Sequence, residues 1–220
     1  NHERVYNFLR LINHFNTFTN LAVIRHRLQI EHSKEVIEEG KRLDPKNIID
    51  EHTRLDLTAL DCFTIDDSST KDMDDALSLE FEPNGYRLGI HISDVASAVP
   101  RDSILDKASS RRITSLYFPD RIVNMLPEEL SQDKISLVKD KVRPALSFIF
   151  EIAQDFKIID CQIKLSKVKI KKRYDYEEAN TLLENPGEHT FEVLYNITAT
   201  HEMQRIENGA IQLHKKEAYV

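Results

Sequence analysis

Five aspartates crowd into one ten-residue stretch of this chain. They are Asp66, Asp67, Asp72, Asp74 and Asp75. Carboxylates this close repel one another, and each raises the pKa of its neighbours. Such a cluster becomes tolerable when water solvates it on a loop or when a bound cation offsets its charge. Because no His or Cys lies among the aspartates, a metal here would have oxygen ligands only, which suits Mg²⁺ or Mn²⁺.

The residues alone leave two interpretations of this acidic loop open. An acidic run is commonly a solvated turn, and it can also be a metal site. A calcium loop of the EF-hand type does not fit, because that loop needs a Gly between its acids and a Glu at its twelfth position, and 66–77 contains no Gly. The flanks, 62–65 and 76–81, are apolar and strand-like. Two buried strands would therefore hold the loop at both ends.

The stretch 76–93 predicts a β-hairpin directly after the acids. Apolar residues alternate on both arms, and Asn84-Gly85 is predicted as the two-residue turn. The return strand ends near His91, which has two interpretations. It could lie near a metal, or it could be a histidine hydrogen-bonded within the sheet, and the second is favoured.

The remaining pattern predicts helices outside an antiparallel or mixed sheet, an α+β fold. We expect helices over 4–16, 19–29, 33–43, 103–112, 175–184 and 190–207, and further strands over 144–152, over 158–172 and from 210. The irregular stretch 113–137 holds Tyr117. The lysines of 163–173 could follow a phosphate backbone, but a solvated sheet face is the favoured interpretation.

Composition is that of an ordinary globular chain. Of 220 residues, 40% are hydrophobic and 30% charged, with a net charge of −7. That charge does not suit a protein that simply coats nucleic acid, although a local basic channel would be compatible with it. With no apolar run near the ~18 residues of a membrane span and no secretion signal, we expect no membrane partner and a cytoplasmic location. Cys62 and Cys161 are expected to be reduced core residues. The first residue is Asn, which suggests a fragment or a processed chain.

Seven motifs resemble, in the same order, those of the ribonuclease II / ribonuclease R family, whose catalytic module is the RNB domain. They are Arg54 to Thr58, Thr64-Ile65-Asp66 with Asp72 to Leu77, His91 to Val95, Thr114 to Pro119, Met125 to Ser131, Ser136-Leu137, and Ala145 to Ser147. Several motifs in register over about 100 residues are a far more specific signal than one.

The resemblance implies a Mg²⁺-dependent, hydrolytic 3′→5′ exoribonuclease that degrades single-stranded RNA to nucleoside 5′-monophosphates. By motif position, Asp66, Asp72 and Asp75 would bind metal (Mg²⁺, with Mn²⁺ an alternative), and Asp74 would be catalytic. Tyr117 would stack on the terminal base, with a core tyrosine as the alternative. Asp67 falls in the variable gap of the motif and is expected to be a bystander.

The resemblance covers only the front half of the catalytic domain. It implies an incomplete RNB-type barrel core over 61–220, a helical lead-in over 25–60 and an unassigned helical segment over 1–24. No counterpart is found for the family's phosphate-contacting arginine, which lies in the second half. Asn124 and Ile135 depart from the family pattern without touching the acids.

Two other functions stay open. The chain could be a non-catalytic RNA-binding or scaffold module that keeps the fold, or an acidic cation-binding module without a nucleic-acid role. The number of metals, the oligomeric state and the choice between ribonuclease II and ribonuclease R types are not determined by the sequence.

Overall fold

A computed structural model describes residues 2–16, 19–44, 53–118, 121–185, 187 and 189–212. The chain divides into two compact units, residues 1–34 and 35–220. Within the described residues, no helix is both long enough and apolar enough to cross a membrane.

The first unit holds two helices, α1 (His2–Leu11) and α2 (Leu21–Arg25), and both are shorter than predicted. Asn13 and Arg27 have φ values of 57° and 50°, in the left-handed region. A residue in that conformation turns the backbone out of the helix just after its last turn. The apolar pattern continued past these positions, so periodicity alone overestimated both lengths.

The second unit contains the sheet and the remaining helices. Its elements are α3 (Lys34–Arg42), β1 (Leu55–Asp56), β2 (Cys62–Asp66), β3 (Asp75–Glu82), β4 (Gly85–Ser93), α5 (Val95–Ala98), α6 (Ile104–Arg112), β5 (Leu116–Phe118), β6 (Arg121–Val123), the π-helix η1 (Leu130–Lys134), β7 (Val142–Ala153), β8 (Ile158–Asp175), α7 (Tyr176–Glu184) and α8 (His189–Glu207). The predicted α+β class, with a mixed sheet and helices outside it, is confirmed.

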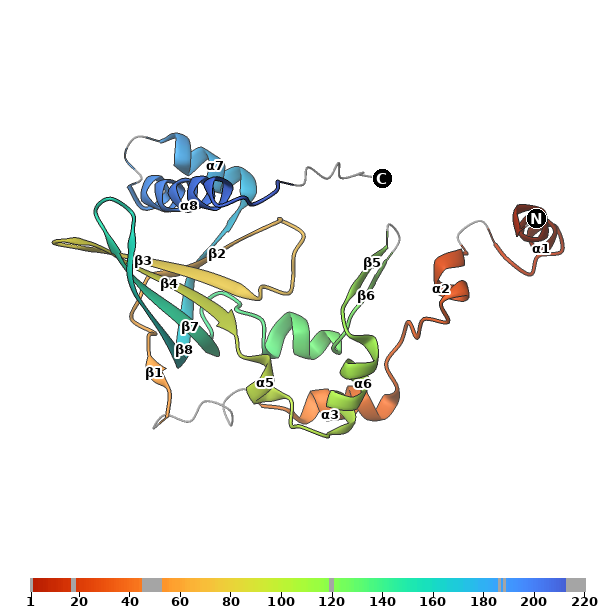
Figure 1. The fold of residues 1–220 in the computed structure, drawn as a ribbon. Helices are drawn as coiled ribbons and strands as arrows, with labels where there is room; N and C mark the ends of the chain where they lie inside the picture. Colours follow the sequence, from red (N-terminus) through yellow and green to blue (C-terminus); the bar gives the residue numbers. More distant parts are fainter. Residues whose placement is uncertain are drawn as a thin grey trace. The chain divides into compact units, whose positions relative to one another are not determined.

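In the described part of the chain, six strands form one sheet in the order β1-β8-β2-β3-β4-β7, and β7 also pairs with β8. The pairing therefore closes into a ring of five strands, with β1 beside β8. Strand β8 makes this possible through its length of 18 residues. Its first part, Ile158–Lys169, pairs antiparallel with β7, and its last part, Ile170–Asp175, pairs parallel with β2. Figure 1 shows the long β7–β8 pair crossing the β3–β4 hairpin.

The predicted hairpin is confirmed, but its turn lies one residue earlier than expected. Glu82 pairs with Gly85, so Pro83 and Asn84 connect β3 to β4. Gly85 begins the return strand with a φ of 155°, and a Cβ atom there would collide with the backbone carbonyl oxygen of Ile152 on β7. Glycine is therefore required at position 85 because β7 approaches closely there, and the turn itself consists of Pro83 and Asn84.

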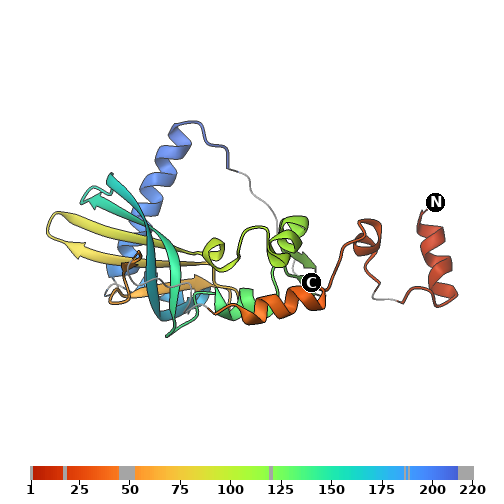
Figure 2. The same cartoon turned by 90° about the horizontal axis from the view of Figure 1, so that it is seen from below.

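Capping residues mark the starts of helices α6 and α7. Ser103 caps α6 by accepting a hydrogen bond from the Asp106 amide, and Asp175 forms a capping box with Glu178 at the start of α7. Helix α8 packs its buried Val193 and Ile197 against Leu88 and Ile152 of the sheet. Figure 1 shows α7 and α8 next to each other, and Figure 2 shows α8 alongside the strands.

Three other predictions were wrong or incomplete. The stretch 113–137 was expected to be irregular, but it contains the β5–β6 hairpin and η1. No strand includes 210–212, and the rest of that predicted strand lies outside the described residues. Cys62 is buried as expected, whereas Cys161 is exposed; both are free thiols.

Candidate active site

The acidic loop joins two neighbouring antiparallel strands. Asp66 is the last residue of β2 and Asp75 is the first of β3. The strands therefore place these two carboxylates at the two ends of the loop, and Asp72 and Asp74 lie on the segment that returns to β3. Apolar residues produce this arrangement, since Cys62 and Phe63 on β2 and Ala76 on β3 are buried.

The return segment of the loop is anchored to the core. The Met73 side chain is buried, and its amide donates to Ser136 Oγ at 2.9 Å. The Leu137 amide donates to the Met73 carbonyl oxygen at 2.8 Å, and the Ser93 amide donates to that of Asp74 at 2.8 Å. The backbone that carries Asp72 and Asp74 is thus fixed by residues that lie far away in the sequence.

The first part of the loop is held by Arg173 of β8. Its Nη2 atom donates to the carbonyl oxygens of Asp67 at 3.1 Å, Ser68 at 3.2 Å and Thr70 at 2.7 Å. The Asp67 carboxylate accepts from the amide and hydroxyl of Ser69 at 2.8 and 2.6 Å. Hydrogen bonds from the Ser69 hydroxyl and amide lower the pKa of Asp67. Asp67 therefore stabilises the turn of the loop, and its expected role as a bystander in the chemistry stays a prediction.

The four acids of the motif influence one another electrostatically. Burial raises the pKa of Asp66, and the negative charges of Asp75 and Asp72 add to that effect. Burial also raises the pKa of Asp74, followed by the charges of Asp72, Asp75 and Asp66. Asp66 Oδ2 is buried and makes no hydrogen bond within the described part of the chain. A buried anionic oxygen without a donor is costly, so a cation at this position would be stabilising.

Tyr117 shares a cleft with two of these acids. The cleft has a volume of about 510 Å³ and is lined by Ser69, Thr70, Lys71, Asp72, Asp74, Tyr117, Arg121, Ile122, Asn124, Glu128 and Gln132. Tyr117 lies on β5 and is 70% exposed, so it is not a core tyrosine. Its pKa is raised by partial burial and then by the charges of Asp72 and Asp74. Asp66 and Asp75 do not line this cleft.

Cations also reach the cleft. Lys71 comes from the acidic loop, and Arg121 comes from β6, which pairs with the strand of Tyr117. Carboxylates, an exposed aromatic ring and two basic side chains therefore surround one hollow. These are the groups needed to bind a metal ion, stack a base and contact a phosphate.

The donor set suits a hard cation, because it consists of carboxylate oxygens and includes the unpartnered Asp66 Oδ2. Among the described residues, however, no three His, Cys, Asp or Glu side chains lie close enough together to bind one ion. The structure thus brings the four acids within electrostatic reach without forming a closed metal cage. The roles of Asp66, Asp72, Asp74, Asp75 and Tyr117 stay predictions.

His91 lies elsewhere, inside the ring of strands. It is fully buried, its Nε2 atom lies 3.0 Å from Ser78 Oγ and its Nδ1 atom lies 2.7 Å from Ser147 Oγ. Ser147 continues the chain of hydrogen bonds to Ser166 at 2.6 Å. The favoured interpretation, a histidine hydrogen-bonded within the sheet, is confirmed.

Three of the six basic residues on β8 are engaged within the protein. Lys167 pairs with Asp56 at 3.1 Å and Lys171 with Asp61 at 2.8 Å. Together with Arg173, which binds the loop, they occupy alternate positions on one face of the strand. This arrangement supports the solvated, paired face over a path for phosphates.

Comparison with known proteins establishes the family. The RNB domain family matches residues 54–220, about three quarters of the chain. The chain belongs to the RNB domain family. It is 37% identical over 193 residues to the ribonuclease R of Chlamydia pneumoniae, an alignment that covers 85% of this chain and 29% of that protein.

Solved structures agree with this assignment. The structure of Mycoplasma genitalium RNase R in complex with ribose-methylated single-stranded RNA has a TM-score of 0.80 and 25% identity, covering 89% of this chain and 32% of that one. Yeast Ssd1, described as a pseudonuclease, shares the fold at a TM-score of 0.66 and 20% identity, over 75% of this chain and 21% of that one. This chain spans less than a third of the length of these RNase R proteins. The predicted domain boundaries after residues 24 and 60 stay predictions, although the family match begins at Arg54.

Sequence reasoning missed the residues that position the acids. The sequence predicts Arg173 as part of a basic strand, and Ser136 is identified only as part of a motif that resembles the family. The separation between Arg173 and the loop is more than 100 residues, so no local pattern reveals their contact. The one local signal in the sequence is the position of Arg173 at the end of the basic run, two residues before the Asp175 cap.

Proposed function

We propose that this chain carries the acidic half of the catalytic site of a hydrolytic 3′→5′ exoribonuclease that acts on single-stranded RNA. The observation that carries the proposal is the cleft in which Asp72 and Asp74 face the exposed Tyr117. The similarity to ribonuclease R proteins supports RNA as the substrate. A ring at the cleft wall lets the last base stack without regard to its identity, and the acids lie beside it, where the terminal phosphodiester would then be.

Mg²⁺ is the proposed cofactor. Asp66, Asp72 and Asp75 are its proposed ligands, and their side chains would have to move closer together to bind one ion. When bound, it would acidify a water molecule and offset the charge on the phosphate oxygens. The negative charges that raise the pKa values of Asp66 and Asp74 would be compensated in the same way.

Asp74 is the proposed proton acceptor. In the reaction, the oxygen of a water molecule forms a bond to phosphorus and the 3′ oxygen of the preceding nucleotide leaves. The Asp74 carboxylate takes a proton from the attacking water, and the leaving 3′ oxygen takes a proton from solvent and becomes a hydroxyl. The product is a nucleoside 5′-monophosphate. The buried environment that raises the pKa of Asp74 favours this role, because a carboxylate is a more effective general base when its pKa lies nearer the working pH.

The alternative is a module that binds RNA without cleaving it. The structural similarity to a pseudonuclease supports this candidate. The two differ in one measurement, the shortening of a 5′-labelled single-stranded RNA in Mg²⁺ by the chain and by its Asp74→Asn variant. The enzyme predicts stepwise loss from the 3′ end, reduced at least about 100-fold in the variant, with unchanged RNA affinity. The binding module predicts RNA binding by both proteins and cleavage by neither.

The metal is tested separately and without an activity assay. Mg²⁺ should raise the thermal midpoint of the chain, because a ligand that binds only the folded state stabilises it. Asp66→Asn should reduce that increase. An equal increase in both proteins would remove Asp66 from the metal site.

A further inference from the structure

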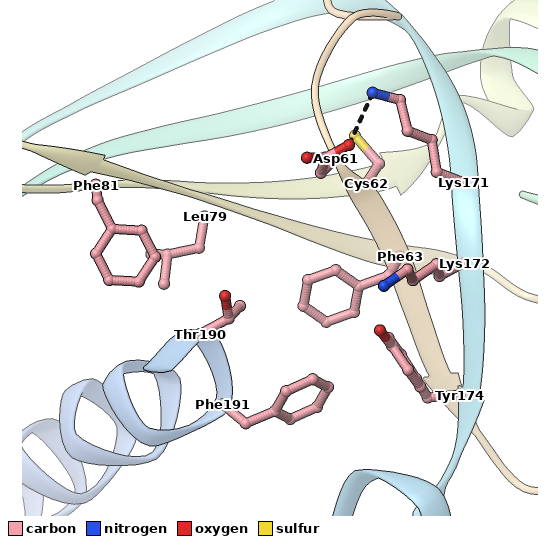
Figure 3. A pocket seen from close by; sticks show the side chains of 10 residues that line it. All are labelled: Asp61, Cys62, Phe63, Leu79, Phe81, Lys171, Lys172, Tyr174, Thr190 and Phe191. Carbon is pink, nitrogen blue, oxygen red and sulfur yellow. Dashed lines mark hydrogen bonds and ion pairs between the residues drawn. The ribbon is translucent and has the colours of Figure 1, made fainter. Parts of the chain in front are cut away.

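A second hollow lies beside β2 and is separate from the acidic cleft. It has a volume of about 350 Å³ and is formed by β2, β3, β8 and the first turn of α8. Its walls are Asp61, Cys62, Phe63, Leu79, Phe81, Lys171, Lys172, Tyr174, Thr190 and Phe191 (Figure 3). None of these residues lines the acidic cleft. Its size falls in the range of sites that bind small molecules.

Aromatic rings make up much of the wall of this hollow. Phe63 and Phe191 are almost fully buried, and their centroids lie 5.6 Å apart. Tyr174 meets both rings edge-on, at centroid distances of 5.6 and 5.2 Å. Phe81 on β3 is 56% exposed at the rim. The three inner rings fix one another's orientation, and they leave an apolar wall against which a flat ring can pack.

Three polar groups border the same hollow and make no hydrogen bond or ion pair with the residues that the structure describes. The Lys172 ammonium lies 5.9 Å from the centroid of the Tyr174 ring. Unlike Lys171, which pairs with Asp61, it makes no ion pair with a described carboxylate. The hydroxyl groups of Tyr174 and Thr190 make no hydrogen bond to described residues either. Figure 3 shows the Thr190 hydroxyl pointing toward the space between Leu79 and Phe63.

We propose that this hollow, named here the Tyr174 pocket, binds a nucleotide, with the base against the aromatic wall and the phosphate near Lys172. A hydrocarbon ligand would leave the ammonium and the two hydroxyls unused, and an inorganic anion would leave the rings unused. A nucleotide joins an aromatic ring, hydroxyl groups and a negative charge in one small molecule, so it matches all three features. The proposal is independent of the cleavage reaction, because none of the four motif acids, Asp66, Asp72, Asp74 and Asp75, lines the pocket.

Two sources could supply this ligand, a free nucleoside monophosphate or one unit of an RNA chain. Both present the same base and phosphate, so the experiment uses adenosine 5′-monophosphate (AMP) and a 5′-phosphorylated pentaadenylate in parallel. Dissociation constants are measured by calorimetry or by protein-observed NMR on the full 220-residue chain, without Mg²⁺ so that cleavage does not interfere.

AMP should bind, and adenosine and ribose 5-phosphate should each bind about tenfold more weakly, which corresponds to about 1.4 kcal/mol. Lys172→Gln and Phe81→Ala should each weaken AMP about fivefold or more, through loss of the cation and of the rim ring. Both side chains are exposed, so the fold should survive, which circular dichroism checks. Lys164→Gln is the matched control, an exposed lysine on the same strand outside the pocket.

The pentaadenylate identifies the source. Weaker pentaadenylate binding in Lys172→Gln means that the pocket accepts units of an RNA chain, whereas an effect on AMP alone means that it accepts free mononucleotides. The proposal is overturned if AMP does not bind at ~10 mM (weaker than about 3 kcal/mol), or if Lys172→Gln and Phe81→Ala bind it as well as the unmodified chain. Loss of AMP binding in Tyr117→Ala with retention in Lys172→Gln would place the nucleotide in the acidic cleft and equally overturn it.

Discussion

The buried His91 makes the stability of this chain depend on pH in a calculable way. Burial lowers the pKa of His91 from 6.5 to about 4, and its two ring nitrogens contact Ser78 and Ser147, which are neutral. In the unfolded chain the imidazole titrates near 6.5. Between about pH 6.5 and 4 the unfolded chain therefore binds a proton that the folded chain does not. The free energy of unfolding should fall over this interval and stay constant, as far as His91 is concerned, above it.

The magnitude follows from the same two values. The interval from 6.5 to about 4, at about 1.4 kcal/mol for each pH unit, corresponds to about 3 kcal/mol. Conversion to a free energy is justified because the His91 side chain is fully buried and solvent does not screen it. Asp66 and Asp74 act in the opposite sense, because their raised pKa values let the folded chain take up protons first.

The assay compares the chain with its His91→Gln variant. A glutamine can still hydrogen-bond to a serine but does not titrate, so all other groups contribute equally to both proteins. Urea unfolding at several pH values between 7.5 and 4.5, followed by far-UV circular dichroism because the chain has no Trp, gives both free energies. The variant is expected to be less stable at pH 7.5, and the difference should shrink by about 3 kcal/mol toward pH 4. Parallel pH profiles, or an NMR titration of folded His91 near pH 6.5, would refute the reasoning.

Three further predictions concern the loop, the hairpin and the cleft. Arg173→Met removes the donor to three loop carbonyls, so it should speed amide exchange in 67–72 and lower cleavage about tenfold with unchanged RNA affinity. Arg173→Lys should restore part of the lost protection and activity, and Lys164→Met is the control. Equal exchange rates in Arg173→Met and the unmodified chain would contradict the role of Arg173 in holding the loop. Gly89→Ala places a Cβ against Ser78 Oγ and His91 Nε2 and should cost about 1–3 kcal/mol in urea unfolding, whereas Gly187→Ala should not. Tyr117→Ala should weaken RNA binding by about 1–3 kcal/mol in a filter or anisotropy assay, and Tyr117→Phe should keep it; equal losses would argue against stacking.

Local patterns predicted the elements that have local causes. The β3–β4 arms alternate in hydrophobicity, α6 and α7 begin at Ser103 and Asp175, and α8 ends before Gly209, whose φ is 91°. The β5–β6 hairpin escaped prediction because each strand has only three residues, too few for a period to show. The turn at Pro83 and Asn84 was misplaced because the need for Gly85 comes from β7, which lies more than 60 residues away.

The same distinction between local sequence patterns and long-range contacts applies to the candidate site. The four acids and Tyr117 were named from a family resemblance, and the structure shows that Asp72, Asp74 and Tyr117 reach one cleft. Composition and spacing contain nothing about which side chains hold them there. Ser136 and Arg173 contact the loop across 63 and 105 residues of sequence, respectively, and such contacts exist only once the chain has folded.

The geometry of the acids therefore depends on the closure of the ring of strands. The β3–β4 hairpin is local and can form early, since closing a short loop has a small entropic cost. Arg173 lies in the last part of β8, which pairs with β2 across more than 100 residues of sequence, whereas the first part pairs with β7. Until that non-local pairing forms, Asp75 has its strand but the carbonyls of Asp67, Ser68 and Thr70 lack their donor. Substitutions that weaken the β2–β8 contact should thus impair the order of the acidic loop before they unfold the hairpin, and amide exchange, measured residue by residue, would show the loop opening at a lower free energy than β3.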